Sequence, residues 1–454
     1  MVVNINKIFF ILFIFLVTNS YASNSMQIIR DSEIEFFLQK LINNIIKHSD
    51  KKSKILYPRL ISNNDYNAFV TGTNKIYVNT GLINQAHSID EIQGVLAHEI
   101  GHLFLKHHNS RLINRKNSSR YSKIATAAGV ALTLAGKLDP TTATGLIIGG
   151  QDLGIKSYLQ FSRIQETQAD NFALEVIKKS KISYLGLEYL LNRLSEEQFL
   201  SKSSQSNYYR SHPISQSRLE QFKRYKNKFL EKQKEKKYIS FQKNKISLEY
   251  VKNKIKSYNK DAFKTIKKIP HKKDFFSYYS LSIAYLKIGK YDLAIDNLNI
   301  IKKNYKNYPF FYELAGDIYF KKGDLNKAIE NYENVIKLLQ NDEAASDTLI
   351  RFSLARSFLQ TNKVNNIKKA INLLEELILI EPNWSYLWRL IAQGSGKINK
   401  KGITYIALAE EAMIKNNFKK AKKYVDIGLR DPLLPIPYRI RGNDITARIK
   451  IKKK

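Results

Sequence analysis

A pair of histidines one helical turn apart is the feature of this sequence that points most directly to chemistry. His98 and His102 enclose Glu99 in the run His98-Glu99-Ile100-Gly101-His102, and apolar residues surround this run. On an α-helix, side chains at positions i and i+4 lie on one face, so the two imidazoles can bind one Zn²⁺ ion. Zinc lowers the pKa of a coordinated water to about 7, and Glu99 can accept the proton as that water attacks a peptide carbonyl. The run predicts a hydrolytic zinc site with one ion per chain.

A catalytic zinc ion needs a third protein ligand, and two carboxylates are candidates for it. Glu166 and Asp170 lie one turn apart on a second expected helix, over about residues 157–179. One of them can bind the metal while the other orients a ligating imidazole. An exposed acidic pair near a helix start is the alternative, and the spacing alone does not decide between the two.

Several other histidines are not assigned to this site. His107 and His108 follow the helix of the His98 and His102 pair, and a continuing helix would place them more than one turn beyond it. We therefore expect them to form its polar end. No sequence neighbour suggests a partner for three further histidines, His48, His87 and His271.

The elements that must hold these residues are mostly helical. Residues 31–47 have the apolar periodicity of an amphipathic helix. Ser88 with Glu91 forms a capping box that opens the helix of the histidine pair, which extends to about residue 106. Two runs at 55–61 and 75–79 predict short strands between turn-rich segments. These segments predict an α+β domain that is mostly helical, with a small sheet.

The first 22 residues have the composition of a secretory signal peptide. Lys7 gives a weakly positive start, residues 8–17 are an unbroken apolar run, and Ser20 and Ala22 suit a cleavage site. The run is too short for a comfortable membrane span, and a retained anchor is the alternative. Because the sequence has no cysteine, an exported chain must be stabilised by packing and by its metal rather than by disulfides.

The sequence is strongly basic, with 75 Lys and Arg against 40 Asp and Glu and a net charge of +35. A polyanionic partner is one explanation. The other is a lysine-rich composition throughout the chain, which we prefer because the lysines are scattered and no nucleic-acid motif accompanies them. We therefore expect no nucleic-acid partner and leave peripheral contact with a membrane as an alternative.

The second half of the sequence contains repeated helical hairpins. Two regular copies are offset by 34 residues, because Tyr285, Gly289 and Ala294 recur as Tyr319, Gly323 and Ala328. Two less regular copies surround Ala370 and Ala421. An offset of 34 residues is the period of tetratricopeptide repeats, in which small residues allow paired helices to approach and glycine occupies the turn. We expect an all-α tetratricopeptide-repeat solenoid here.

Changes in composition divide the chain into domains. The candidate site and its elements occupy residues 23–222, after the signal peptide at 1–22. A basic, solvated helical connector is expected over 223–273, the solenoid over 274–430, and a basic tail without assigned structure over 431–454. Within the first domain lies the apolar stretch 124–155, each half of which is too short for a membrane span. We expect it to pack over the site as a lid or plug, with a membrane-facing role as the weaker alternative.

Several motifs together resemble peptidase family M48. They are Asn67-Ala68-Phe69, the run from Ile76 to Leu82, the run from Gly94 to His102, the pair Glu166 and Asp170, and Ser211-His212-Pro213 with Arg218. The resemblance covers roughly residues 30–222 and implies a zincin-like metallopeptidase fold. It also implies that His98, His102 and Glu166 bind zinc, that Glu99 is the general base and that Asp170 supports a ligating imidazole.

The resemblance implies roles for two later residues as well. His212 would occupy the fourth zinc position and hold the site inactive, or stabilise the oxyanion when displaced; a turn histidine before Pro213 is the alternative. Arg218 would help to polarise the substrate carbonyl. Strand 76–79 is either the edge to which an extended peptide adds or a plain structural edge.

With its signal peptide and repeats, the chain resembles M48 peptidases of the Gram-negative periplasm that act on outer-membrane proteins. This implies a periplasmic zinc endopeptidase whose partners are unfolded or misassembled outer-membrane proteins and, through the repeats, the outer-membrane assembly machinery. A chaperone-like adaptor with a repressed or structural zinc site is the alternative. Glu99 favours the enzyme, because a structural site needs no general base.

Overall fold

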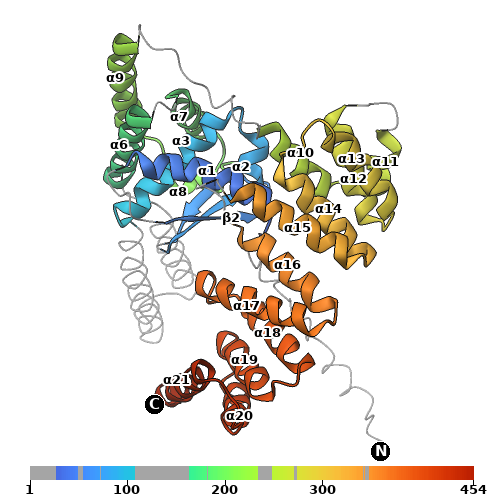
Figure 1. Cartoon of the computed structure of the whole chain (residues 1–454). Helices are drawn as coiled ribbons and strands as arrows, with labels where there is room; N and C mark the ends of the chain where they lie inside the picture. Colours follow the sequence, from blue (N-terminus) through green and yellow to red (C-terminus); the bar gives the residue numbers. More distant parts are fainter. Residues whose placement is uncertain are drawn as a thin grey trace, which may run out of the picture.

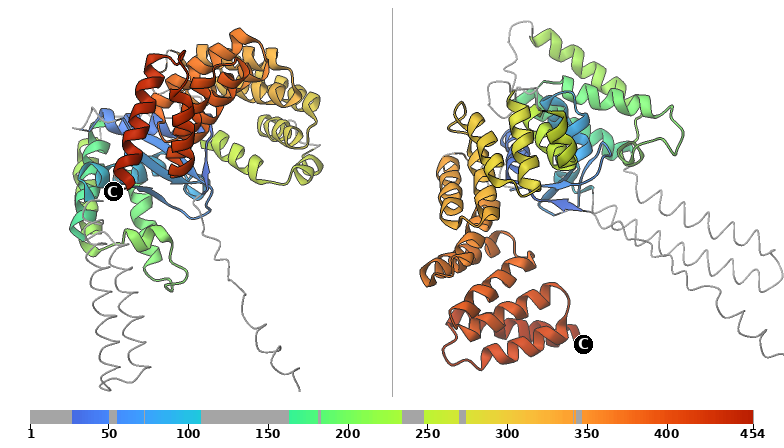
Figure 2. Two further views of the ribbon diagram at one scale, coloured as in Figure 1. Left: turned by 90° about the horizontal axis from the view of Figure 1, so that it is seen from below. Right: turned by 90° about the vertical axis from the view of Figure 1, so that its right-hand side faces the viewer.

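The computed structural model describes residues 27–49, 55–71, 73–107, 163–180, 183–233, 248–269, 274–340, 342 and 347–453. The expected signal peptide, the apolar stretch 124–155, His108 and His271 lie outside these ranges. An N-terminal α+β domain is followed by a curved array of helices (Figures 1 and 2), which confirms the predicted fold class. No helix in the described ranges is long and apolar enough to span a membrane.

The sheet of the N-terminal domain has the strand order β1-β2-β4-β3. Its strands are β1 (Ile28–Ile29), β2 (Tyr57–Ile61), β3 (Ala68–Val70) and β4 (Lys75–Asn79), and β4 pairs parallel with β2 and antiparallel with β3. The expectation that strand 76–79 is an edge was therefore wrong. Because the chain turns back after β3 and inserts β4 between β2 and β3, β3 is the edge strand on that side within the described residues.

The helix that carries the histidine pair, α3 (Ile89–Phe104), lies in the middle of the domain. It begins as predicted, since the Ser88 side chain accepts a hydrogen bond from the Glu91 N–H at 3.2 Å. It packs against α6 (Arg163–Ser180) and α7 (Leu185–Glu197). At Gly101 an added Cβ would lie only 3.1 Å from the Ala169 carbonyl oxygen. The missing side chain thus allows α6 to bring its carboxylates close to α3.

Further helices complete the domain and the array. In the first domain they are α1 (Ser32–Lys47), α2 (Thr80–Gln85), α8 (Asn207–Ser211) and α9 (Gln216–Gln233). Next come α10 (Leu248–Asn259), α11 (Ala262–Lys268), α12 (Phe275–Lys287), α13 (Tyr291–Lys302), α14 (Pro309–Lys322), α15 (Leu325–Leu339), α16 (Thr348–Gln360), α17 (Val364–Ile380), α18 (Ser385–Lys397), α19 (Lys401–Ile414), α20 (Phe418–Leu429) and α21 (Ile436–Lys453).

The hairpin turns of the array share a left-handed backbone residue. Gly289 and Gly323, which the 34-residue period identified, have φ angles of 75° and 90°. Asn362, Asn399 and Asn416 have φ angles of 56°, 55° and 57° in later turns. Asparagine tolerates this conformation better than other residues with a side chain. The later copies are thus less regular in sequence because asparagine replaces glycine.

The structure differs from the prediction at the C-terminal tail. Residues 431–454 were assigned no structure, yet most of them form α21, which packs against α19 and α20. Ile445 and Ile449 are buried there in one cluster with Ile406 and Val425. Pro435 lies immediately before this helix and Pro437 lies in its first turn, where proline is tolerated.

The expected solvated connector also differs, because α10 is part of the core. Leu248, Val251 and Ile255 are buried with the hydrophobic residues of the first domain. Lys254 is also buried and forms ion pairs with Asp31 and Glu33 at 2.9 Å each. The high density of Lys and Arg predicted a solvated segment, but Lys254 of α10 lies inside the protein.

Helix α1 joins the first domain to the array. Most of its apolar residues belong to the first core, but Phe36 belongs to the core of the array, with its ring centroid 5.2 Å from that of Phe310. Arg59 of β2 adds ion pairs with Glu35 of α1 and with Glu381, which follows α17. The two parts are therefore joined by packing and by buried charges.

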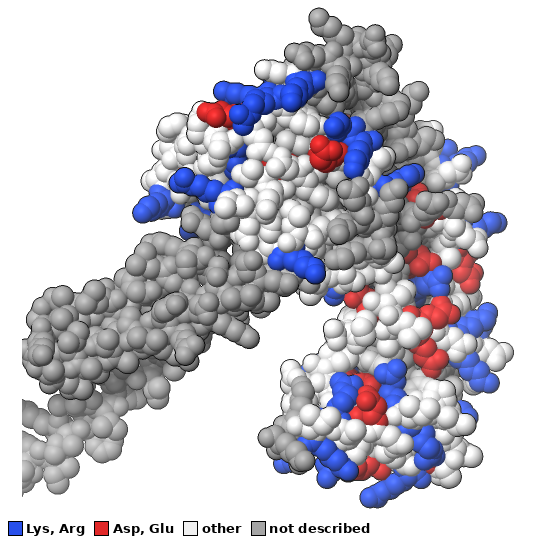
Figure 3. Space-filling model, turned by 90° about the vertical axis from the view of Figure 1, so that its left-hand side faces the viewer, with Lys and Arg blue, Asp and Glu red and all other residues white. Residues whose placement is uncertain are grey.

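Lys and Arg are spread over the face shown in Figure 3 rather than gathered in one patch, and Asp and Glu lie among them on the array. On this face the distribution agrees with the preferred explanation of the net charge, a lysine-rich composition throughout the chain.

Candidate metal centre and active site

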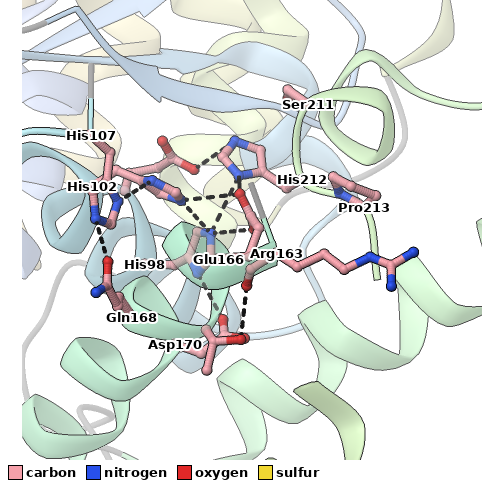
Figure 4. A network of polar contacts seen from close by, with 12 residues as sticks. His98, His102, His107, Arg163, Glu166, Gln168, Asp170, Ser211, His212 and Pro213 are labelled. Carbon is pink, nitrogen blue, oxygen red and sulfur yellow. Dashed lines mark hydrogen bonds and ion pairs between the residues drawn. The ribbon is translucent and has the colours of Figure 1, made fainter. Parts of the chain in front are cut away.

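Four side chains from three segments converge at the centre of the first domain (Figure 4). His98 and His102 come from α3, Glu166 from α6, and His212 directly follows α8. One potential ligand atom from each lies within 4.8 Å of the others, and all four residues are buried. The Nε2 atoms of the two α3 histidines are 3.1 Å apart, and each is 3.4 Å from a Glu166 oxygen.

This donor set suits a divalent metal ion. Two imidazoles and a carboxylate are a common set of protein ligands for zinc in catalytic sites. The Nδ1 of His98 is 2.9 Å from Asp170 Oδ1, so with a metal ion bound Nδ1 would carry the ring proton and Nε2 would offer its lone pair to the ion. The His98 Nε2 and the buried Glu166 carboxylate are 3.4 Å apart, a separation that suits two ligands of one cation.

Glu99 lies beside the cluster and contacts two residues of the α8 segment. Its Oε1 accepts a hydrogen bond from the Tyr208 hydroxyl at 3.1 Å and is 3.4 Å from His212 Nε2. The Tyr208 ring also packs on the His212 ring, with centroids 4.6 Å apart. A buried carboxylate next to the candidate metal ligands is thus held in place from one side.

Arg218 connects the two carboxylates of α6. Its Nε and Nη2 donate to the Asp170 oxygens at 2.6 and 2.9 Å, and its Nη1 is 3.0 Å from Glu166 Oε2. Nη1 also donates to the Pro213 carbonyl at 2.9 Å. The expectation was that Arg218 polarises a substrate carbonyl, but here all three guanidinium nitrogens are engaged by the protein.

Comparison with known proteins agrees with this geometry. The sequence model of peptidase family M48 matches residues 31–226, and that of a tetratricopeptide repeat matches 311–342. Residues 31–226 form an M48 peptidase domain. With its cluster of potential metal ligands, this domain makes the chain a metallopeptidase with a helical repeat domain.

Named relatives match either most of this chain or about a third of it. The "Beta-barrel assembly-enhancing protease" of Escherichia coli K12 is 20% identical over 387 residues, which cover 85% of this chain and 77% of that protein. The protein of that name from Yersinia pestis is 21% identical and covers 87% and 79%. The "Metalloprotease LoiP" of E. coli K12 is 28% identical over 156 residues, which cover 34% of this chain and 57% of that protein.

Burial and charge set the protonation of the M48 site. Burial raises the pKa of Glu99 above its usual value, as a general base near neutral pH requires. Burial acts to raise the pKa of Glu166, but His212 and Arg218 outweigh it and hold that pKa well below the usual range. Burial acts to lower the pKa of His98, but hydrogen bonds with Asp170 and Glu166 raise it to about 9. The carboxylates therefore stabilise positive charge at the point where a metal ion would lie.

Sequence reasoning missed two residues of the site. Tyr208 could have been noticed as an aromatic residue one turn before His212. His107 was expected to lie beyond the site, but Lys106 has a φ angle of 60° and turns the chain back, so that His107 Nδ1 is 3.0 Å from His102 Nδ1. The expectation was wrong because it assumed that the helix continues.

Two other histidines are remote from the cluster. His48 Nδ1 contacts the Asn44 carbonyl oxygen at 2.8 Å, and His87 Nδ1 contacts Glu91 Oε2 at 3.2 Å.

Proposed function

We propose that this metallopeptidase is a zinc-dependent endopeptidase of the periplasm that degrades misfolded or stalled outer-membrane proteins and assists their assembly through its repeats. The observation that carries the proposal is the buried set of His98, His102 and Glu166 with Glu99 beside it. The names of the full-length relatives support the substrate class. The sequence pattern of residues 1–22 supports export.

The side chains of the site divide the work of hydrolysis. His98, His102 and Glu166 would hold the zinc ion, which supplies Lewis-acid activation of a water molecule and of the substrate carbonyl. Glu99 accepts the proton of the attacking water and returns it to the leaving amine. Asp170 orients His98, and Arg218 holds Asp170 and Glu166 in position, which its contacts favour over direct contact with substrate.

Strand β3 offers a place for an extended substrate. It pairs with β4 on one side, is an edge within the described residues, and packs against α3. An unfolded segment can add to such an edge through main-chain hydrogen bonds, which tolerate many sequences. This suits a peptidase whose substrates share an unfolded state rather than a sequence.

The repeats offer a groove for a protein partner, which we propose to be the outer-membrane assembly machinery. The groove has a volume of about 760 Å³ between α17, α18, α19 and α21, and its lining includes Ile371, Leu379, Trp388 and Tyr438. Mixed apolar and charged linings of this kind are common in protein interfaces.

Metal removal tests the enzymatic part of the proposal. We expect a chelator to reduce casein hydrolysis by the chain from residue 23 onward to the background rate, because Glu99 alone cannot activate water or the carbonyl. About one equivalent of Zn²⁺ per chain should restore hydrolysis, whereas Mg²⁺, which prefers oxygen ligands, should not. Casein hydrolysis that persists in fully metal-free protein contradicts the proposal. Faster cleavage of an unfolded than of a folded β-barrel protein would support the substrate class.

The position of His212 favours a second candidate, in which the site is held inactive. Its Nδ1 is 3.0 Å from Glu166 Oε1 and 3.3 Å from His98 Nε2, so it can serve as a fourth donor. A fourth protein ligand would close the position that a substrate needs. The chain would then act mainly as a chaperone-like adaptor until this histidine moves.

We expect His212→Ala to raise the basal rates of casein cleavage and self-digestion, because it frees that position. His48→Ala is the matched control, since His48 lies outside the cluster. Both rates should be measured with the zinc content of each variant. An unchanged rate with unchanged zinc would show that His212 is only a turn residue, and a lower rate would show that its main role is to stabilise the oxyanion.

A further inference from the structure

We infer that His107 is a positioning residue that fixes the tautomer and ring orientation of His102, and that Gln168 fixes His107 in turn. The inference rests on the proposed zinc binding by His102. It adds a chain of hydrogen bonds that runs from the cluster to the surface of α6 (Figure 4).

The backbone after α3 brings His107 to this place. The helix ends at Phe104, and Lys106 adopts a φ angle of 60°, which a residue with a side chain seldom adopts. The chain therefore reverses within two residues, and the His107 side chain returns to α3. His107 is only 5% exposed.

The direction of each hydrogen bond follows from the use of His102 Nε2. This atom is 3.1 Å from His98 Nε2 and 3.4 Å from Glu166 Oε1, so it is the nitrogen available to a metal and must be unprotonated. The neutral ring then carries its proton on Nδ1, which faces His107 Nδ1 at 3.0 Å. His107 Nδ1 can only accept this proton's hydrogen bond, so the His107 proton lies on Nε2. That nitrogen is 3.0 Å from Gln168 Oε1, which is an acceptor.

Both histidines of α3 thus have an outer partner, but the partners differ in charge. His98 Nδ1 contacts the Asp170 carboxylate, whereas His102 Nδ1 contacts a second imidazole. Metal-binding histidines commonly donate a hydrogen bond from the second ring nitrogen to such a partner, and this hydrogen bond raises metal affinity. His107 is not itself a fourth ligand, because its two nitrogens face His102 Nδ1 and Gln168.

Zinc affinity of the full chain, measured by competition with a chromogenic chelator, tests the inference without using activity. We expect His107→Phe to weaken zinc binding by about 10- to 100-fold, the range typical of lost outer partners. His107→Gln should recover most of that loss, because its amide oxygen can accept from His102 Nδ1. Gln168→Leu should weaken binding less, since it removes only the partner of His107. The visible spectrum of bound Co²⁺ should change in His107→Phe and less in His107→Gln.

Melting in the presence of a chelator separates positioning from a general packing defect. A positioning role predicts that His107→Phe lowers the melting temperature of the zinc form more than that of the metal-free form. A zinc affinity of His107→Phe within about twofold of the original overturns the inference but not the proposed function. Equal losses of zinc affinity in His107→Phe and His107→Gln do the same. If His107→Phe does not fold, the Gln168→Leu variant decides: zinc affinity and a Co²⁺ spectrum that are both unchanged in Gln168→Leu overturn the inference. Absence of zinc binding by the unaltered chain overturns the proposed function and the inference together.

Discussion

Replacing Glu99 by glutamine is expected to reduce peptide hydrolysis by about 10²- to 10⁴-fold while zinc stays bound. A glutamine keeps the size of the side chain, and its amide oxygen can still accept the hydrogen bond from Tyr208. It cannot accept a proton from water, however, so the loss should appear in the chemical step. The measurement is the initial rate of casein hydrolysis together with the zinc content per chain.

Glu91→Gln is a matched control for this experiment. Glu91 is also a buried carboxylate of α3, and its Oε1 accepts a hydrogen bond from Tyr66 at 2.8 Å. It lies two turns before Glu99, and its carboxylate contacts Tyr66 and His87, neither of which is a candidate metal ligand. We expect its replacement to leave the rate within a few-fold of the original. Comparable turnover by pure Glu99→Gln would remove Glu99 as the base, and loss of zinc from this variant would mean that Glu99 supports the metal instead.

The sequence predicted those parts of the site that depend on local spacing. His98, Glu99 and His102 lie in one short run, and Glu166 and Asp170 lie one turn apart, so helical geometry alone places each set on one face. The 34-residue period likewise depends on spacing, and it identified the turns at Gly289 and Gly323. All of these features need only the secondary structure to be right.

The parts that were missed depend on backbone turns and on long-range pairing. His107 reaches His102 only because Lys106 adopts a positive φ angle, for which lysine gives no signal. Strand β4 lies between β2 and β3 because of pairing across the sheet, which strand sequences do not specify. Arg218 of α9 forms ion pairs with Asp170 and Glu166 of α6. This role could not be predicted without knowing that the two helices pack together.

The second large expected effect is a loss of stability when the connection between the peptidase domain and the repeats is weakened. The central residue of this connection is Glu33. It is fully buried on α1 and accepts hydrogen bonds from the hydroxyls of Tyr279 at 2.8 Å and Tyr308 at 2.5 Å. Lys254 Nζ is also 2.9 Å away. Burial acts to lower the pKa of Lys254, but Asp31 and Glu33 raise it well above its usual value. Lys254 therefore keeps its positive charge in the folded protein up to at least about pH 10.4, the usual lysine value.

We expect Glu33→Ala to lower the free energy of unfolding by about 3–5 kcal/mol, as removal of one partner of a buried ion pair does. Two tyrosine hydroxyls would lose their acceptor, and Lys254 would keep only Asp31. Urea unfolding followed by circular dichroism measures the change. The control is Asp342→Asn, which breaks the ion pair with Lys40 of the same α1 helix; both partners are about one-third exposed, so this should cost no more than about 1 kcal/mol.

The same contacts predict how the two domains unfold. Because Phe36 of α1 packs in the core of the repeats and Glu33 depends on their tyrosines, the peptidase domain and the first repeats should unfold in one transition. Removing the repeats to test partner binding would therefore also destabilise the active site, and point variants in the groove at Leu379 or Tyr438 are the better test. If Glu33→Ala instead produced two separate transitions with peptidase activity retained after the first, the network would be a removable contact between independent domains. Equal effects of Glu33→Ala and Asp342→Asn would show that burial of this network adds nothing to stability.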